Sequence, residues 1–350
     1  RKAVVRTGAA AGNRPVSGRG GYLLRKIGWA LVTVAVVITF NFVLFRVLPG
    51  DPAKSGLRDP RLNPAAVEAL RERFGIDKPV FLNLEGGNPL DSQFTAYLGA
   101  LSRGDLGTSY AFRDQPVSDL ISGALVNTLW LVLPSQVLAI LLGSALGLFA
   151  AWRRGRPLDI TALTFSLFMW SLPTFFLGII LLVAGANWFG LPTAGRITIG
   201  ADFASFADLA WDVGRHLLLP TLTLTLVLLG EYMLIMRSSV LDVFGEDYIL
   251  TARAKGLSTY RIIRHHALRN AMLPMVTLIA LNLGFTVSGA IQVEAVYSWP
   301  GLGALTVNAV GDRDYPVLQG AFLLIALAVV FANLVAEMIY GWLDPRVSEG

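Results

Sequence analysis

Long uncharged stretches recur along the chain, and their length predicts helices that cross a membrane. Because an α-helix rises about 1.5 Å per residue, about 20 apolar residues span the hydrocarbon core of a bilayer. A lysine, arginine or aspartate at the centre of such a helix costs about 2.5–3.5 kcal/mol, and these stretches are almost free of them. The sequence therefore predicts an all-α polytopic membrane protein with six transmembrane helices, at residues 27–45, 127–152, 160–186, 217–236, 271–292 and 315–343.

The first stretch predicts a retained helix rather than a cleaved signal peptide. Its 19 uncharged residues exceed the apolar core of a signal peptide, which has about 7–15 residues. The sequence that follows, RVLPGDP, contains no small-x-small cleavage site. We therefore expect residues 27–45 to remain as a helix and residues 127–343 to form the core membrane domain.

Lysine and arginine are concentrated in one tail and in particular loops, which orients the helices. Residues 1–26 carry seven basic residues and no acidic one, and the segment 237–270 carries six basic residues. The loop 293–317, expected on the opposite side, carries one. Since basic short loops stay in the cytoplasm, both tails, 1–26 and 344–350, are predicted to be cytoplasmic. This one-sided distribution explains the net charge of +5 better than nucleic-acid binding does.

The segment 46–126 is then extracytoplasmic, and it is long enough to contain a small folded element. Asn63 followed by Pro64 suits the start of a helix, and apolar residues follow at helical spacing until Gly75. We expect a short amphipathic helix at 64–74 over the outer membrane face. It is either a packing lid or a docking surface or gate.

Composition agrees with a membrane protein and excludes several kinds of site. Hydrophobic residues make up 54% of the chain and charged residues 15%, against about 25% charged in a soluble domain. The sequence has no cysteine and three histidines, so thiolate metal sites are excluded and no metal is expected. His265 and His266 are adjacent and point about 100° apart on a helix, so they cannot share one ion.

The sequence offers no catalytic motif, and we expect neither an enzyme nor a cofactor in this chain. Gly99 and Gly104 have the glycine spacing of a phosphate-binding loop, but Asp105 stands where that loop requires lysine. An aspartate there would repel phosphate. Any nucleotide hydrolysis must therefore take place on another subunit.

A pair of glycines in the second predicted helix, Gly143 and Gly147, forms a GxxxG motif. Such a motif lets two helix backbones approach closely. We expect that contact to lie within this chain, with a partner's helix as the alternative.

Residues 237–270 predict two short helices that meet at an elbow outside the bilayer. Gly256 suits a left-handed residue that ends the first helix, and Ser258 can cap the second. Small residues at the bend, Ala252 and Ala254, suggest that another surface packs closely there. The alternative is a basic helical loop that only serves the topology.

This elbow resembles the cytoplasmic coupling segment, or EAA loop, of ABC importer permeases. The general pattern has Glu-Ala-Ala followed by a glycine, and here Leu250-Thr251-Ala252 and Gly256 stand in those places. The departure is itself similar to the form found in dipeptide and oligopeptide permeases, DYxxTARAKGLS…HALRN…P. Residues 247–257 and 266–270 match that form.

Further landmarks of the same subfamily cover nearly the whole chain in the expected order. They are 48–52 (LPGDP), 104–109 (GDLGTS), 172–175 (LPTF), 191–195 (LPTAG), 296–303 (VYSWPGLG) and 313–316 (RDYP). The long external segment is similar to that of the B-type of the two permease subunits. Single motifs of this kind are weak, but their number and order are specific.

The resemblance implies a type I ABC importer permease fold in a bacterial plasma membrane. It implies four kinds of partner: a second homologous permease subunit, one or two ABC ATPase subunits that hold ATP and magnesium, an extracytoplasmic solute-binding protein, and a di- or oligopeptide substrate. Membrane lipid surrounds the helices, and no nucleic acid is implied. By resemblance the ATPases dock on the elbow, through Asp247, Tyr248, Thr251, Ala252, Arg253, Lys255, Gly256 and Leu257.

Two polar residues inside the predicted helices, Glu231 and Asn282, are candidates for the pathway. Glu231 lies six residues before Arg237, about 9 Å inside the cytoplasmic end of its helix. An ionisable group at that depth indicates a functional site, unless it pairs with a buried arginine or snorkels to the interface. Asn282 suits either a wet passage or an interhelical hydrogen bond.

The loop after the fifth predicted helix is expected outside the membrane, with a turn at Trp299, Pro300 and Gly301. By resemblance this loop, with Arg313 and Asp314, forms part of the external mouth or contacts the binding protein. The alternative is a membrane-interface anchor, because tryptophan and tyrosine favour that depth.

Three other functions stay open from the sequence. The chain could belong to a related importer for nickel or another small solute. A self-sufficient secondary transporter or channel would show inverted repeats and midplane carboxylates, and neither is clear. A membrane receptor or assembly factor would leave the small residues of the elbow unexplained.

Overall fold

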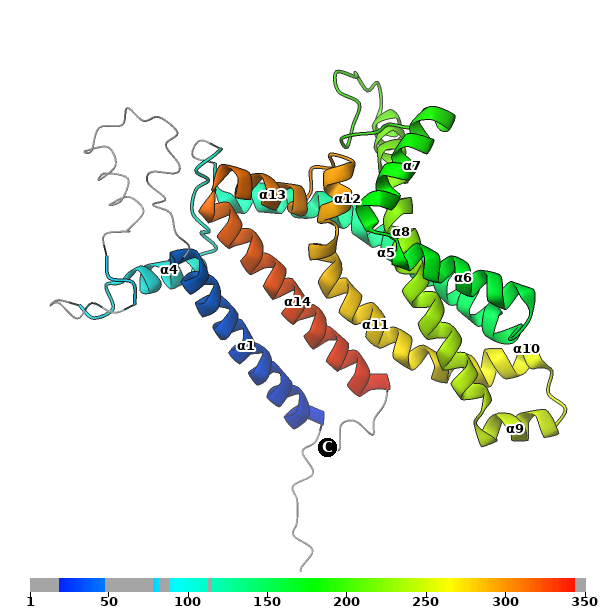
Figure 1. The fold of residues 1–350 in the computed structure, drawn as a ribbon. Coiled ribbons are helices and arrows are strands. Elements are labelled where there is room, and N and C mark those ends of the chain that lie inside the picture. Colours follow the sequence, from blue (N-terminus) through cyan, green and yellow to red (C-terminus); the bar gives the residue numbers. More distant parts are fainter. Residues whose placement is uncertain (1–18, 48–77, 82, 84–87, 113–114, 344–350) are drawn as a thin grey trace, which may run out of the picture.

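The computed structural model describes residues 19–47, 78–81, 83, 88–112 and 115–343. Figure 1 shows that this part of the chain is built from helices, which confirms the all-α prediction. The elements are α1 (Arg19–Val47), α4 (Gln93–Ser102), α5 (Val117–Trp152), α6 (Pro157–Ser171), α7 (Thr174–Phe189), α8 (Phe206–Phe244), α9 (Asp247–Ala254), α10 (Thr259–Ile262), the π-helical turn η1 (Ile263–Ala267), α11 (Leu268–Gly289), α12 (Ile291–Val296), α13 (Leu302–Asp312) and α14 (Tyr315–Leu343).

Several of these helices are long and apolar enough to cross a membrane. Among the described residues, α1, α5, α8 and α14 meet that test, and α6 with α7 adds a fifth crossing if the bent pair is one span. α11 covers most of the fifth predicted helix, and its 22 residues lie within the usual length of a crossing. The count of six crossings stays a prediction.

The third predicted helix, residues 160–186, is not continuous. It is divided between α6 and α7, which meet at an angle of 104°. The break lies at Leu172 and Pro173, where Leu172 is extended (φ −74°, ψ 134°). Proline lacks the N–H that a helix needs and disfavours helical backbone in the residue before it. Hydropathy alone does not register this effect, so the sequence prediction ran the helix through Pro173.

α8 packs closely against α5 on one side and against α6 on the other. A Cβ added to Gly143 would lie 2.7 Å from the Tyr232 Cβ, and one on Gly147 would lie 2.5 Å from the Met233 carbonyl oxygen. A Cβ on Gly230 would lie 2.5 Å from the Ser166 carbonyl oxygen of α6. The prediction that the GxxxG motif makes a contact within the chain is therefore confirmed.

Gly147→Val is expected to destabilise the protein, because the added side chain meets backbone atoms of α8 that cannot yield. Overpacking of this kind costs about 1–3 kcal/mol, and sometimes more. The midpoint of thermal unfolding in mild detergent should fall clearly below that of the wild type. Gly123→Val is the matched control, because Gly123 lies on the same helix with no atom within 4 Å of its added Cβ. Equal midpoints for the two variants would contradict this account of the α5–α8 contact.

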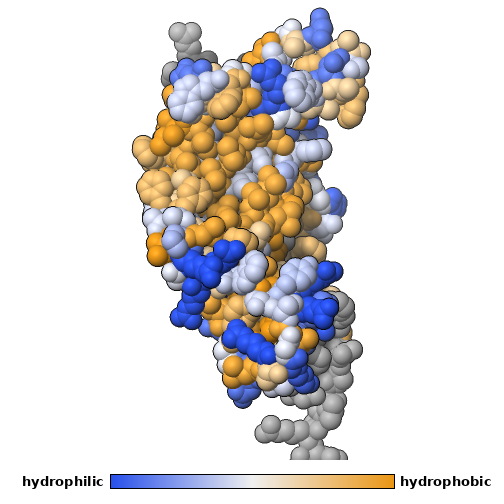
Figure 2. All heavy atoms as spheres, turned by 90° about the vertical axis from the view of Figure 1, so that its right-hand side faces the viewer, coloured by the Kyte–Doolittle hydropathy of each residue, from blue (hydrophilic) through white to orange (hydrophobic). Residues whose placement is uncertain are grey.

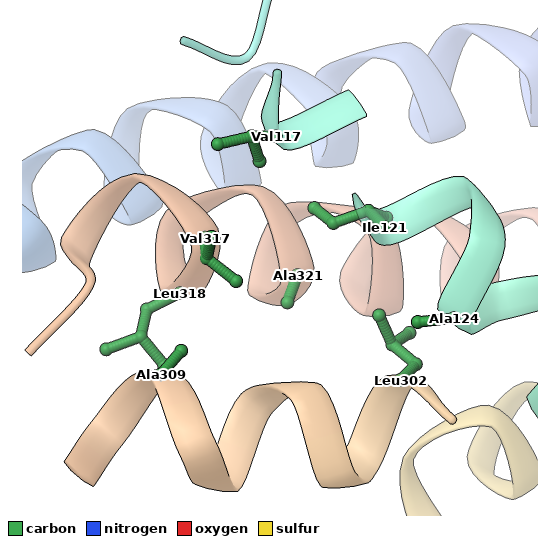
Figure 3. Packing of buried hydrophobic residues seen from close by; sticks show 8 residues of the cluster. All are labelled: Val117, Ile121, Ala124, Leu302, Ala309, Val317, Leu318 and Ala321. Atoms are coloured by element: carbon green, nitrogen blue, oxygen red, sulfur yellow. The ribbon is translucent and has the colours of Figure 1, made fainter. Parts of the chain in front are cut away.

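The N-terminal ends of α5 and α14 are joined through α13, which lies across them. Figure 3 shows the apolar cluster that these three helices share. Its buried residues are Val117, Ile121, Ala124, Leu302, Ala309, Val317, Leu318 and Ala321. This packing fixes the outer loops relative to the membrane helices.

α1 packs on α14, and its outer end holds part of the external segment. The Asn41 side-chain amide donates to the Gln319 carbonyl oxygen at 3.0 Å. The buried Phe42 ring meets Phe94 and Tyr97 of the α4 helix, with ring centroids 5.1 Å and 5.5 Å away. The amphipathic helix expected at 64–74 lies outside the described residues.

The surface and the helix ends agree with the predicted sidedness. Figure 2 shows a broad apolar band between polar atoms at the two ends of the molecule. In Figure 1, the start of α1, the end of α14 and helix α9 all lie toward the same end. A cytoplasmic position for both termini stays a prediction, and this arrangement supports it.

Candidate functional site

The elbow predicted at 237–270 is present, and glycine shapes its first arm. α8 ends at Phe244, and the chain turns through Gly245 and Glu246 into α9. Gly256 follows α9 with φ +75°, the left-handed backbone that the sequence predicted. Ser258 precedes α10 as expected, although its side chain makes no capping hydrogen bond there.

The second arm differs from the prediction of a separate short helix. α10 continues through the π-helical turn η1 directly into α11. Residues 259–268 contain no glycine or proline, so nothing in this stretch ends the helix. π-Helical turns are rare and often lie at functional sites. The second arm of the elbow is therefore continuous with the N-terminal end of α11.

A small apolar cluster holds the two arms together. Ile249 and Ala252 of α9 are buried against Ile262 and Ala267 of the second arm. Phe244 at the end of α8 packs against the same cluster. Ala252 is 5% exposed, so its small side chain serves close packing inside the elbow.

Two polar contacts fasten α9 to the neighbouring membrane helices. The Asn270 side-chain amide of α11 donates to the Tyr248 hydroxyl at 2.7 Å. The Arg253 guanidinium lies 5.7 Å from the centre of the Phe244 ring of α8, within cation–π range. These contacts join α9 to both α8 and α11.

Most of the residues predicted to dock a partner lie on the open side of this elbow. Asp247, Tyr248, Thr251, Arg253, Lys255 and Gly256 are exposed, Leu257 is half-buried and Ala252 is buried. Sequence reasoning missed Leu250 and Tyr260, which are 55% and 63% exposed. An apolar leucine and an aromatic ring in a polar segment between two apolar helices are a signal that could have identified them. Docking at these positions stays a prediction.

A buried ion pair, also missed by sequence reasoning, braces α8 just before the elbow. The Arg237 Nε and Nη2 atoms donate to Asp159 Oδ1 and Oδ2 at 2.7 Å and 2.9 Å. The Gly155 backbone N–H donates to the same carboxylate at 2.9 Å. Asp159 is 2% exposed, and it belongs to α6. This pair joins the α5–α6 connection to the C-terminal part of α8.

The structure brings the two candidate pathway residues together. The Asn282 amide donates to Glu231 Oε2 at 3.0 Å and to the Tyr232 hydroxyl at 3.2 Å. Gln136 of α5 bonds the same hydroxyl. No ion pair found in the described part of the chain includes Glu231. Its partner there is the neutral amide of Asn282 rather than a buried arginine.

A buried carboxyl group organises the loop between α11 and α13. Glu294 is fully buried and accepts hydrogen bonds from the Thr128 hydroxyl at 2.6 Å and from the Ala304 N–H at 2.9 Å. It therefore caps the start of α13, where backbone N–H groups lack helical partners. Burial raises the pKa of the Glu294 carboxyl, while the hydrogen bonds from Thr128 and the α13 backbone lower it. Gly301 and Gly303 leave the space that its side chain occupies.

The predicted outer contact residues divide into buried and open ones. Trp299 is fully buried, and its indole N–H donates to the Asn127 carbonyl oxygen at 2.9 Å, so this side chain packs inside the described part of the chain. Asp314 is 1% exposed and accepts from the Ala111 N–H at 3.1 Å.

Gly301 is buried, as Trp299 and Asp314 are. Pro300 and Arg313 are exposed. A partner could therefore reach Pro300 and Arg313 among the predicted contact residues. Such a contact stays a prediction.

Comparison with known proteins gives matches over both halves of the chain. Residues 143–349 match the family described as "Binding-protein-dependent transport system inner membrane component". Residues 21–132 match "Binding-prot-dependent transport system membrane comp, N-term".

Similar proteins include permeases of glutathione transport systems. The chain is 36% identical to "Glutathione transport system permease protein GsiC" of Salmonella typhi over 326 residues, which is 93% of this chain and 98% of the relative. It is 35% identical over the same length to the protein of that name in Escherichia coli strain K12. Its fold is similar to a chain of the inward-facing MetNI methionine ABC transporter, with a TM-score of 0.52, 18% identity and coverage of 64% of this chain and 96% of that one.

Proposed function

The chain belongs to the family of binding-protein-dependent transport system inner membrane components, and we propose that it is the permease through which an ABC importer takes up short peptides. Family membership makes it a multi-pass permease subunit of an ABC importer in the inner membrane. The proposal adds the substrate class. Glutathione, a tripeptide, is included because it stands in the names of relatives.

The observation that carries the proposal is the elbow formed by α9 and the start of α11. It has the sequence form of peptide permeases, and its exposed side presents residues that a partner can contact. Tyr248 and Arg253 tie α9 to α11 and α8. A subunit that moves α9 would therefore move both helices together.

The proposed mechanism uses the elbow as a lever between ATP hydrolysis and the membrane helices. ATP and magnesium bind on one or two ATPase subunits, which dock at the elbow from the cytoplasm. Closure of these subunits shifts α9, and the Asp159–Arg237 pair passes the shift to α6 through α8. Such coupling requires two states with different contacts.

The proposed assembly has two further partners. A second permease subunit completes the pathway, and an extracytoplasmic binding protein delivers the peptide near Pro300 and Arg313. Glu294 and Asp314 hold that outer surface in a fixed shape by capping α13 and α14.

Uptake in a bacterial strain that lacks this chain tests the substrate class. Cells complemented with the wild-type chain should accumulate radiolabelled glutathione or alanyl dipeptides well above cells with empty vector. Labelled nickel is the comparison substrate. Accumulation of nickel without any peptide would contradict the proposal and favour a metal importer.

A further inference from the structure

The polar cluster around Glu231 lies in the middle of the predicted membrane core. It joins α5, α8 and α11 through Gln136, Tyr232, Glu231 and Asn282. Glu231 lies 13 residues before Phe244, where α8 ends, which is about 20 Å along the helix. The cluster is therefore far from both the elbow and the outer loop.

The cluster holds hydrogen-bond acceptors that have no partner in the part of the chain that the structure describes. Glu231 Oε2 accepts from Asn282, while Oε1 has no partner among the described residues. Gln136 is 2% exposed, and its Oε1 atom is buried without a partner. A carboxylate accepts hydrogen bonds and does not donate them. A group that binds to these oxygens must therefore donate hydrogen bonds, and a carboxylate binds a cationic donor most strongly.

Glu231 lies on the less buried face of α8, where a ligand can reach it. Val227, Glu231 and Leu234 are half-buried and Ser238 is exposed, and their spacing places them on one side of the helix. Met233, on the opposite side, is fully buried. A charged group facing lipid would cost about 2.5–3.5 kcal/mol, so this face adjoins water or another subunit.

We infer that Glu231 and Asn282 form a transit site for the α-ammonium group of the peptide as it crosses the membrane. This inference rests on the proposed function. Every linear peptide carries that group whatever its side chains, so one carboxylate serves a whole substrate class. A transit site must bind weakly enough to release its ligand. A half-buried carboxylate held by a neutral amide meets that need, whereas a permanent ion pair does not.

Photolabelling of the purified complex, with all its subunits and in lipid nanodiscs, tests this site. The probes are a dipeptide with a diazirine side chain and a free amino terminus, and the same dipeptide N-acetylated. In the wild type, the free-amine probe should label fragments containing Glu231 or Asn282 at least fivefold more than the acetylated probe. In Glu231→Gln this preference should fall below twofold. Asp202→Asn, which neutralises an exposed acid of an outer loop, should keep the wild-type preference.

Three outcomes would overturn the inference. The first is equal labelling of the wild type by both probes, and the second is an unchanged preference in Glu231→Gln. The third is loss of another subunit from the Glu231→Gln complex, because that loss would assign the carboxylate to a subunit contact. Dipeptide uptake by cells separates the two proposals. Uptake by the wild type together with any of these outcomes refutes only the transit site, whereas absence of uptake refutes the peptide function itself.

Discussion

Gly256→Val is expected to abolish peptide uptake while the amount of protein in the membrane stays near the wild-type level. Gly256 has φ +75°, and left-handed backbone costs an ordinary L-residue about 1–2 kcal/mol. A β-branched residue is a genuine outlier there. The turn would have to rearrange, and α9 would no longer present its exposed face in the same direction. Uptake of labelled dipeptide, with membrane protein quantified by immunoblot, measures the effect.

Gly200→Val is the matched control for this change. Gly200 has φ +76°, and its added Cβ also meets no atom within 4 Å, so the backbone strain is the same. It lies in the loop before α8, at the opposite end of that helix from the elbow. Uptake near the wild-type level is expected. Wild-type uptake in Gly256→Val as well would refute the role of the elbow in coupling.

Asp159→Asn is expected to destabilise the chain and to lower uptake at least tenfold. The change leaves Arg237, whose side chain is 21% exposed, without its counter-charge. Breaking a buried ion pair by removing one partner costs about 3–5 kcal/mol, and the partial exposure of Arg237 places the expected cost near the lower end. The midpoint of thermal unfolding in detergent, followed with uptake, measures both effects.

A double variant and a control identify the source of that loss. If the pair itself matters, Asp159→Asn combined with Arg237→Gln should be little less stable than Asp159→Asn alone. Asp242→Asn removes an exposed acid near the same end of α8 and should change little. Additive losses in the double variant would contradict the idea that this pair braces the elbow.

The helices could be predicted from hydropathy, because apolar length alone decides whether a helix can cross a bilayer. The break at Pro173 was missed because apolar residues flank it on both sides, and hydropathy does not count lost hydrogen bonds. The continuous path from α10 into α11 was missed for a related reason. Ser258 marked a helix start, but no signal in the sequence ended that helix before the membrane.

The site could be predicted only in part, because contacts between distant residues leave no local pattern. Asp159 and Arg237 are 78 positions apart, and Glu231 and Asn282 are 51 apart. Glu231 could be identified because it is an acid in an apolar helix. Asp159 could not, because an acid close to several arginines is ordinary in a polar loop. Trp299 was recognised as a landmark, but its indole bonds the backbone of Asn127, which is 172 positions away.

The most direct test of the account is the composition of the complex that this chain forms in its native membrane. Purification in mild detergent, followed by mass spectrometry of every co-purifying protein, gives that composition. The account predicts an ATPase with a phosphate-binding loop and a second multi-span permease in stoichiometric amounts. A chain that elutes alone, or only with copies of itself, would contradict the assignment as an ABC importer subunit.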